Sequence, residues 1–351
     1  MPKKLQLVTV NTKETISRNS KNLLFLGKWC EVNFKKRDLL NKKIKTVNYP
    51  WSNKLIRTKS HRQILKSYDL MKTYLTSHLN TVHKTNYSEK YWEQIFGHWL
   101  MNFITIFHDK AEIINKLKNY KISNFVYLKL NPKDCMPINS SSSKFYFQND
   151  YWNGYLFSLL LERIRPDIKF KKKNISFTNS TYIREIKKNK NIKNYLRTCL
   201  LKILSIISLN NEKFIISSYL NTINELKLQL LVNGFLKFNY LPKIKKKFKI
   251  NPYFRRNNFD SQKSKSLNLI LKDLVLQFLP QSYLEGYQYY KLFSVNKLNW
   301  PKNPKIIFTS NAHFNNDIFK IWLAEKREQK IKFVAGQHGN GYIFPKYTTL
   351  Y

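Results

Sequence analysis

Short, uninterrupted runs of apolar residues punctuate this chain, separated by longer segments of mixed polar and apolar character. Runs of this length, bounded by polar residues or glycine, are typical of buried β-strands. They predict strands at residues 23–26, 125–128, 213–217, 305–309 and 332–335. The longer segments carry apolar residues at helical spacing. They predict helices at 60–83, 88–120, 149–164, 194–209, 264–278, 281–293 and 315–328, with another beginning near Thr222.

The helix at 88–120 has an unusually thick aromatic face. Tyr91, Trp92, Phe96, Trp99 and Phe103 recur along one side of it. Aromatic side chains at this spacing usually pack into a core. We therefore expect Trp92 and Trp99 to be buried, together with Trp152 of the helix at 149–164.

The end of the sequence gives the clearest fold signal. A strand at 305–309, an amphipathic helix at 315–328 and a strand at 332–335 form a βαβ unit, which places its two strands in parallel. The sequence thus predicts an α/β fold, rich in helices, around a Rossmann-like parallel sheet. In such sheets ligands bind beyond the carboxyl ends of the strands. This rule selects residues 27–30, 217–219, 310–313 and 336–342. We expect His313 and His338 to face one shared crevice, with Asn311 and Trp29 on the same face.

Composition suggests how the chain is divided. Residues 1–20 are polar and basic and are expected to form a flexible arm. Residues 21–236 are expected to form an α/β domain with helical insertions. Within it, residues 169–193 are rich in Lys and Asn and are expected to form a loop or an insertion. Residues 237–263 resemble a basic linker or insertion, because they combine basic residues with turn formers. Residues 264–351 then complete the same domain.

The segment after the last predicted strand is the strongest candidate for chemistry. Gly336, Gln337, His338 and Gly339 place two glycines around a polar pair in a chain that has only 8 glycines. Glycine allows close approach of the backbone to a ligand, and an imidazole can accept a proton from a hydroxyl or bind a phosphate. His338 is the candidate catalytic residue and the other three are candidate substrate contacts. The alternative is a tight turn whose histidine caps a carbonyl group.

Other strand ends supply weaker candidates for substrate binding. Asn311 and His313 follow the strand at 305–309, although an asparagine there also suits an Asx-turn or a helix cap. Gly27 and Trp29 follow the strand at 23–26, where the indole could stack on a sugar or a base. The remaining histidines show no metal-ligand spacing, so no metal site is expected.

Charge and motifs narrow the function classes. With 63 Lys and Arg against 21 Asp and Glu, the formal net charge is +42, which favours binding to polyanions. Two interpretations remain open: a functional basic surface, including a nucleic-acid-binding protein without enzymatic activity, or drift in base composition. Dinucleotide, P-loop, nucleophile-elbow and Asp-x-Asp motifs are absent from the sequence. No cofactor is therefore expected.

Cysteine usage and hydropathy bear on location. Three widely separated cysteines do not suggest a disulfide framework, and a reducing cytoplasm fits best. The most apolar stretch, at 200–209, is interrupted by Lys202 and is too short to span a bilayer. We expect a cytoplasmic protein that can contact the inner membrane surface through its basic residues.

The same segments carry a family resemblance. The chain resembles the transferases encoded in O-antigen and other surface-polysaccharide gene clusters, in patches that cover most of its length. The matching patches are LFLGKWC at 24–30, YW at 91–92, GHWL at 97–100, NDYWN at 149–153, SNAH at 310–313 and GQHG at 336–339.

This resemblance implies a two-domain glycosyltransferase of the GT-B type. It implies transfer from a nucleotide-activated sugar, or a related polyol phosphate, to a glycan or a lipid-linked acceptor. His338 would act as the base or as a phosphate contact, and Gln337 and Gly339 would shape its loop. It also implies that a second, donor-binding domain follows Tyr351, so that residues 1–351 alone would be inactive.

Overall fold

The structure is a computed structural model. It describes residues 5–17, 19–31, 39, 41–175, 212–234, 239, 241–242, 246–256 and 266–336. The predicted helix at 194–209 and the predicted contacts Gln337, His338 and Gly339 lie outside the described residues.

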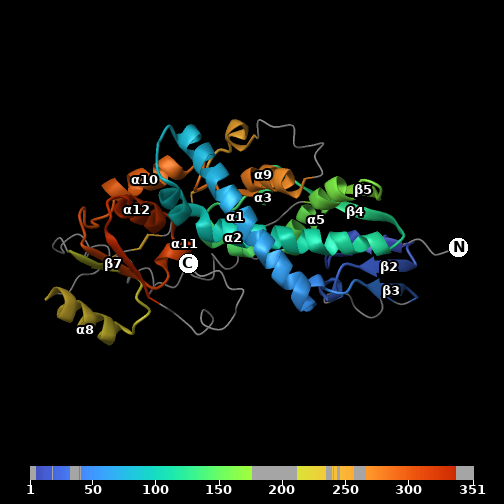
Figure 1. The fold of residues 1–351 in the computed structure, drawn as a ribbon, viewed down its shortest axis with the longest axis horizontal. Coiled ribbons are helices and arrows are strands. Elements are labelled where there is room, and N and C mark those ends of the chain that lie inside the picture. The colour runs from blue at the N-terminus through green and yellow to red at the C-terminus, as the bar shows by residue number, and fades with distance from the viewer. Residues whose placement is uncertain are drawn as a thin grey trace.

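Five parallel strands form a sheet from the first half of the chain, in the order β3-β2-β1-β4-β5. The strands are β1 (Leu5–Val8), β2 (Asn22–Phe25), β3 (Lys43–Thr46), β4 (Ile122–Leu130) and β5 (Lys169–Ile175). Strands β1 and β2 are buried almost completely, which is why apolar residues dominate them. This parallel sheet, covered by helices, confirms the predicted α/β class (Figure 1).

The expectation of a flexible arm at residues 1–20 is wrong for the part that the structure describes. Residues 5–8 form β1, the central strand of the sheet, paired with β2 on one side and β4 on the other. A glutamine in the middle of the strand disguises it in the sequence. Gln6 is buried, but its amide nitrogen donates to the carbonyl oxygen of Thr15 and its amide oxygen accepts from the backbone N–H of Ser17.

The expectation of a loop at residues 169–193 is wrong for residues 169–175, which form β5. This strand pairs with β4 at the edge of the sheet and is largely exposed. Lysines on an edge strand hinder pairing with other chains, so this composition suits an edge although it hides the strand from an apolar pattern. Lys172 lies over the rings of Tyr127 and Phe170.

Three parallel strands form a second sheet in the order β6-β7-β8. The strands are β6 (Lys213–Ile215), β7 (Ile306–Thr309) and β8 (Lys332–Ala335). The segment between β7 and β8 contains α11 (Ala312–Asn315) and α12 (Asp317–Glu328), so the predicted βαβ unit is present. Strand β6 comes from within the predicted domain 21–236 but pairs with β7. The sheets therefore divide between β5 and β6, before the predicted linker.

Two long antiparallel helices run between the sheets (Figure 1). Helix α1 (Lys54–His83) is capped by Asn53, whose side chain accepts from two backbone N–H groups, and α2 (Glu89–Lys116) is capped by Ser88. Trp92 and Trp99 of α2 and Trp152 are buried, as predicted. Helix α2 packs against α12 near its start and against η4 beside the first sheet.

The other helices fill in around this pair. The α-helices are α3 (Pro132–Cys135), α4 (Ser140–Phe147), α5 (Asp150–Ile164), α8 (Thr222–Asn233), α9 (Leu267–Phe278) and α10 (Tyr287–Asn296). The short 3-10 helices are η1 (Lys13–Thr15), η2 (Lys28–Cys30), η4 (Pro50–Ser52), η5 (Leu117–Asn119) and η6 (Pro252–Arg255).

The described part of the predicted linker at 237–263 is packed against the protein. Arg255 is buried, makes a two-pronged ion pair with Glu285 and donates to the carbonyl oxygens of Leu276 and Leu279. Phe248 contacts the rings of Tyr289 and Tyr290. Among the described helices, none is both long enough and apolar enough to cross a bilayer.

Candidate functional site

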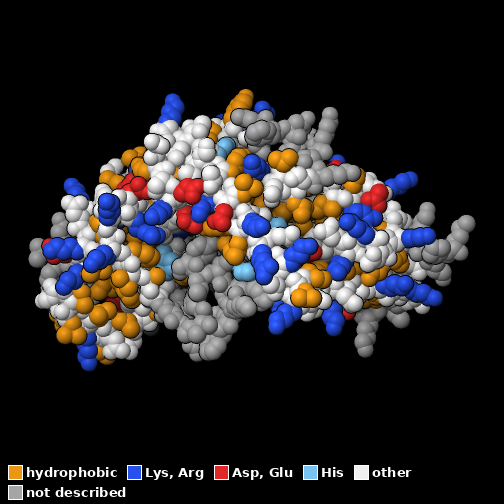
Figure 2. Space-filling model, in the orientation of Figure 1, with side chains coloured by type: hydrophobic (Ala, Val, Ile, Leu, Met, Phe, Trp, Pro, Cys, Tyr) orange, Lys and Arg blue, Asp and Glu red, His pale blue; other side chains and the backbone are white. Residues whose placement is uncertain are grey.

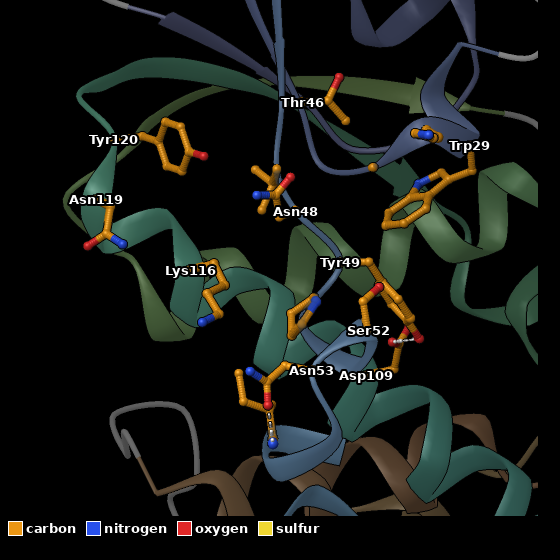
Figure 3. A pocket seen from close by; sticks show the side chains of 15 residues that line it. Trp29, Thr46, Asn48, Tyr49, Ser52, Asn53, Asp109, Lys116, Asn119 and Tyr120 are labelled. Atoms are coloured by element: carbon orange, nitrogen blue, oxygen red, sulfur yellow. Dashed lines mark hydrogen bonds between the residues drawn. The ribbon is translucent and has the colours of Figure 1, made fainter.

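A cleft of about 990 Å³ lies where β2 and β3 end (Figure 3). Its walls are the segments that follow these two strands, the start of α1 and the last turns of α2 with η5. This is the edge at which parallel sheets bind ligands. The lining residues are Gly27, Lys28, Trp29, Thr46, Val47, Asn48, Tyr49, Pro50, Ser52, Asn53, Ile56, Asp109, Lys116, Asn119 and Tyr120.

The structure places the predicted contacts Gly27 and Trp29 in this cleft. The Trp29 ring lies so close to Gly27 that a Cβ atom there would come within 2.0 Å of it. Its indole N–H donates to the carbonyl oxygen of Thr9 at 3.2 Å, and its ring meets that of Tyr49 edge to face at 6.5 Å. Trp29 is therefore held in a fixed orientation while it stays partly exposed.

A carboxylate and a phenol meet on one wall. The hydroxyl of Tyr49 donates to Oδ1 of Asp109 over 2.8 Å. Burial raises the pKa of Asp109 above its ordinary value, while the Lys110 charge and the Tyr49 hydrogen bond oppose that rise. Burial and the nearby Asp109 charge raise the pKa of Tyr49, so the phenol remains a donor at neutral pH.

Sequence reasoning missed both members of this pair. Asp109 was hidden in an aromatic helix and Tyr49 in a loop, 60 residues away. No local signal singles out Asp109, because α2 also carries Glu93, Glu112 and the buried Lys110.

The rest of the lining can bind hydroxyl or phosphate groups. Asn48 and Asn119 contribute amides, and Lys28 and Lys116 contribute ammonium groups. Lys116 lies seven residues after Asp109 on the same helix, so the two share a face about 10 Å apart. An aromatic ring, amides, one carboxylate and two cations can together recognise a polar ligand that carries hydroxyl groups.

The carboxyl edge of the second sheet brings other predicted residues together. The amide of Asn311 donates to the hydroxyl of Tyr219 at 2.8 Å, and the backbone N–H of Gly336 donates to Thr309 at 2.9 Å. Ser217 and Tyr219 adopt left-handed φ angles of 50° and 63°. Such backbone strain often marks functional loops. Tyr219, Asn311 and Gly336, which follow β6, β7 and β8, thus lie at one edge of the second sheet.

The predicted contact His313 lies deeper than the other residues of this edge. Its side chain is only 7% exposed and packs against the rings of Phe314 and Phe333, at 3.9 and 5.6 Å between centroids. His98 of α2 is nearby, and burial, with help from the Lys320 charge, lowers its pKa to about 4. This edge therefore holds neutral imidazole in an aromatic setting at physiological pH.

The expectation that all candidate contacts share a single crevice is wrong for those that the structure describes. Gly27 and Trp29 lie at the edge of the five-stranded sheet, whereas Asn311, His313 and Gly336 lie at the edge of the three-stranded sheet. Figure 1 shows the two sheets at opposite ends of α1 and α2. The reason is that strand pairing splits the chain into two sheets, which local sequence patterns do not reveal.

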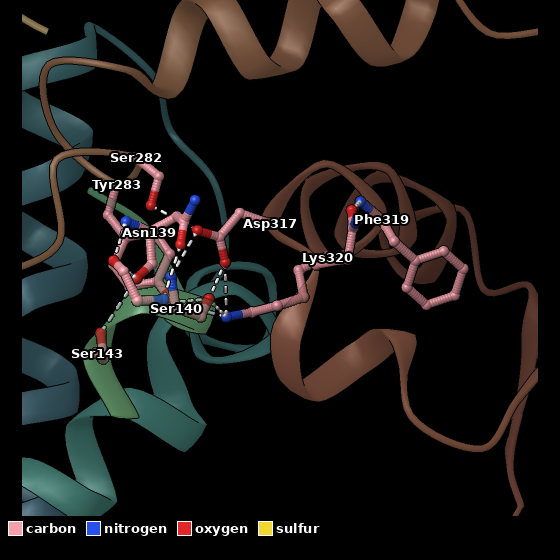
Figure 4. A network of polar contacts seen from close by, with 10 residues as sticks. Asn139, Ser140, Ser143, Ser282, Tyr283, Asp317, Phe319 and Lys320 are labelled. Atoms are coloured by element: carbon pink, nitrogen blue, oxygen red, sulfur yellow. Dashed lines mark hydrogen bonds and ion pairs between the residues drawn. The ribbon is translucent and has the colours of Figure 1, made fainter. Parts of the chain in front are cut away.

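A buried ion pair lies close to the second edge (Figure 4). Asp317 and Lys320 of α12 have fully buried side chains. Asp317 accepts from Ser140, through both its backbone N–H and its hydroxyl, from Ser282 and from Lys320. Lys320 also donates to the hydroxyls of Ser140 and Tyr283. Since the carboxylate is surrounded by donors from the protein, this network ties α12 to α4 and to the turn before α10.

The family of the chain follows from its sequence profile. The LIC12162 family transferase profile matches residues 5–348. The chain belongs to this family. The match to the LIC12162 family spans both sheets and includes residues 337–339. No curated protein and no solved structure is significantly similar to the chain.

Family membership makes group transfer the chemistry to consider at both edges. A transferase must bind both the acceptor and the donor of the transferred group. The cleft at the ends of β2 and β3 combines hydrogen-bonding groups, charged groups and an aromatic ring. Within the part of the chain that the structure describes, no three His, Cys, Asp or Glu side chains are grouped as metal ligands would be.

Proposed function

We propose that this LIC12162 family member transfers a sugar, or a related polyol phosphate, from a nucleotide-activated donor to a glycan acceptor. The observation that carries the proposal is the lining of the cleft at the ends of β2 and β3. Trp29 offers an aromatic face, and Asn48, Asn119 and Asp109 offer hydrogen-bonding groups. Sugars present both an apolar face and a ring of hydroxyls, so this combination suits them.

In this proposal the cleft holds the acceptor together with the transferred end of the donor, because the two must meet for the transfer. The indole of Trp29 packs on one face of the sugar ring, and the amides around it bind hydroxyl groups. Lys28 and Lys116 supply positive charge at the rim, which suits an acceptor that carries a phosphate or a lipid diphosphate. The basic surface as a whole would also favour contact with an anionic membrane, where lipid-linked acceptors reside.

The edge of the second sheet is a second proposed site, for a phosphate-bearing ligand, because it lies at the other end of α1 and α2 from the cleft (Figure 1). Asn311, Gly336 and the strained turn at Ser217 and Tyr219 present polar groups at this edge. His313 and the residues Gln337, His338 and Gly339 complete the proposed set, with His338 as a phosphate contact.

The net charge of +42 does not by itself favour nucleic acid. On the face shown in Figure 2, Lys and Arg side chains are scattered among other residue types and do not gather in one band. Arg255 is committed to Glu285, and Lys172 lies over aromatic rings beside Glu162. A dedicated nucleic-acid surface normally concentrates its cations on one face or groove.

Binding measurements under a salt titration test the proposal. UDP-, GDP- and CMP-activated sugars and methyl glycosides are titrated against the chain, with duplex DNA as the competing class. We expect saturable binding of a sugar ligand that changes little with salt, whereas affinity for DNA should collapse as salt rises. Saturable binding confined to DNA would contradict the proposal and support the nucleic-acid-binding alternative.

Trp29→Ala connects this test to the cleft. Loss of the aromatic face should weaken glycoside binding about tenfold, which corresponds to about 1.4 kcal/mol. Leu55→Ala is the matched control, because Leu55 is 80% exposed close to the cleft but does not line it. Unchanged glycoside affinity in Trp29→Ala would place the sugar elsewhere.

A further inference from the structure

One acidic side chain stands apart in the cleft. Of the residues that line it, Asp109 alone carries a carboxylate. Its Oδ1 atom accepts from Tyr49, while no described group donates a hydrogen bond to Oδ2. A partly buried carboxylate oxygen that faces a cleft without a donor is suited to receive one from a ligand.

The surroundings fix the direction of this oxygen. Asp109 is on a long helix, so its backbone cannot move independently of α2. Tyr49 is held in turn by the rings of Trp29 and Trp51, which meet it edge to face at 6.5 and 6.2 Å. Because the phenol holds Oδ1, the other oxygen is left available to a ligand in the cleft.

The charges around Asp109 make it a usable base. Lys110 follows it on α2, Lys28 and Lys116 line the same cleft, and Tyr49 donates to it. Burial raises its pKa and so strengthens its attraction for a proton, while Lys110 and Tyr49 keep the ionised form accessible. Burial thus favours uptake of a proton and the neighbouring groups favour its release, as an acid–base group requires.

Imidazole does not compete for this role within the cleft. The cleft lining, as far as the structure describes it, contains no histidine. The neighbouring His108 is buried and is hydrogen-bonded to Ser67 at 2.9 Å. The histidines nearest to a strand end, His98 and His313, belong to the other edge.

We propose that Asp109 is a catalytic residue that binds the attacking hydroxyl of the acceptor and takes its proton, with Tyr49 positioning the carboxylate. This proposal rests on the proposed function. As the acceptor oxygen forms its bond to the anomeric carbon of the donor, its proton passes to Oδ2 of Asp109. The bond from that carbon to the phosphate oxygen breaks, and the nucleoside diphosphate leaves with the electron pair. A displacement in one step inverts the configuration of the anomeric carbon.

The test uses methyl glycosides and the chain labelled with ¹⁵N-tryptophan. Methyl glycosides of glucose, galactose, mannose and N-acetylglucosamine are titrated while the indole N–H resonance of Trp29 is followed, assigned with Trp29→Phe. Analogues of the best probe that each lack one hydroxyl are then titrated against wild type and Asp109→Asn. One analogue should bind wild type about 10- to 100-fold more weakly, and that difference should shrink or vanish in Asp109→Asn.

The pH dependence gives a second readout that a purely structural role would not move. Probe affinity for wild type should fall as the pH drops through the pKa of Asp109, because the protonated carboxyl group is a poorer acceptor. Asp109→Asn should show no such limb. Tyr49→Phe should move the limb to higher pH, because it removes a donor that stabilises the ionised carboxylate.

Glu112→Gln is the matched control for charge, since Glu112 is on the same helix outside the cleft. It should behave as wild type in both experiments. If the glycosides shift Trp29 but Asp109→Asn keeps the wild-type pattern across the analogues, the role of Asp109 is refuted and the sugar site stands. If none of the glycosides shifts Trp29, the sugar site and the proposed function fail together.

Discussion

The carboxylates of Asp317 and Asp109 sit in two regions built from the same kinds of side chain. Each has a tyrosine hydroxyl and a lysine in its neighbourhood, and each is shielded from bulk water. Asp317, however, accepts four hydrogen bonds from the protein, whereas Asp109 accepts one and lies at the wall of a cleft.

The two carboxylates differ in how much of their hydrogen-bond acceptor capacity the protein itself satisfies. Around Asp317 every strong interaction is made within the fold, so the network contributes to holding helices together. At Asp109 one carboxylate oxygen can still accept a hydrogen bond from a ligand. Sequence types alone do not separate a structural carboxylate from a functional one; the count of internal donors does.

The largest expected effect is at the closed network. Lys320→Met removes the buried cation and leaves the Asp317 carboxylate without its charge partner. Breaking a buried ion pair in this way typically costs about 3–5 kcal/mol. Urea unfolding of the variant should show this loss. Lys291→Met is the control, because Lys291 and Glu325 are 25% and 20% exposed, and it should cost about 1 kcal/mol or less. Equal losses in the two variants would contradict the contrast.

Acidification should have the next largest effect per residue, and it acts outside the cleft. Burial lowers the pKa of His83, His98 and His108 to about 4, from an ordinary 6.5. Between these values the unfolded chain binds protons that the folded chain does not, so stability falls from pH 6.5 towards pH 4. At pH 5 each histidine should have lowered the free energy of unfolding by about 2 kcal/mol relative to pH 7.

Urea unfolding at pH 7 and pH 5 checks this expectation. His108→Gln should lose its share of the pH dependence, because it no longer titrates. Asp109→Asn should keep the part of the pH dependence of stability that the three histidines contribute, and it should lose the pH dependence of ligand binding. A variant without His108 that is just as acid-sensitive as wild type would show that this histidine is not a source of the effect.

The smallest expected effect tests how closely Gly27 packs against the Trp29 ring in the cleft. In Gly27→Ala the new methyl group would collide with the Trp29 ring, which must move aside. Glycoside affinity should therefore fall by less than the tenfold expected for Trp29→Ala, and stability should fall by about 1 kcal/mol. Titration of the best probe and thermal melting measure the two quantities. In Trp29→Ala the same glycine substitution should have no further effect on affinity.

Much of the fold follows from local patterns, and what does not has a physical cause. The strands at 23–26 and 332–335 were predictable because their apolar runs are uninterrupted. Strands β1 and β5 were not, since Gln6 and a row of lysines replace apolar residues there. The split into two sheets depends on β6 pairing with a strand about ninety residues later, which a local pattern cannot report.

The site was predictable only in part for a similar reason. Gly27 and Trp29 come directly after a strand, so the rule about carboxyl ends finds them. Asp109 comes from a helix and Tyr49 from the loop before η4, and only packing brings them together. Likewise the edge residues Asn311 and Gly336 were found, whereas their separation from Trp29 was not.

Helices α1 and α2 form a rigid connection between the two sheets. Helix α1 has 30 residues, which makes it about 45 Å long, and it begins at the cleft and ends beside Tyr283. Helix α2 returns the other way, from a contact with α12 to Asp109 and Lys116. Loosening of either sheet would therefore strip packing from both helices. We therefore expect the two sheets to unfold cooperatively. The two helices, which contain no hinge, also fix the distance between the carboxyl edges of the sheets.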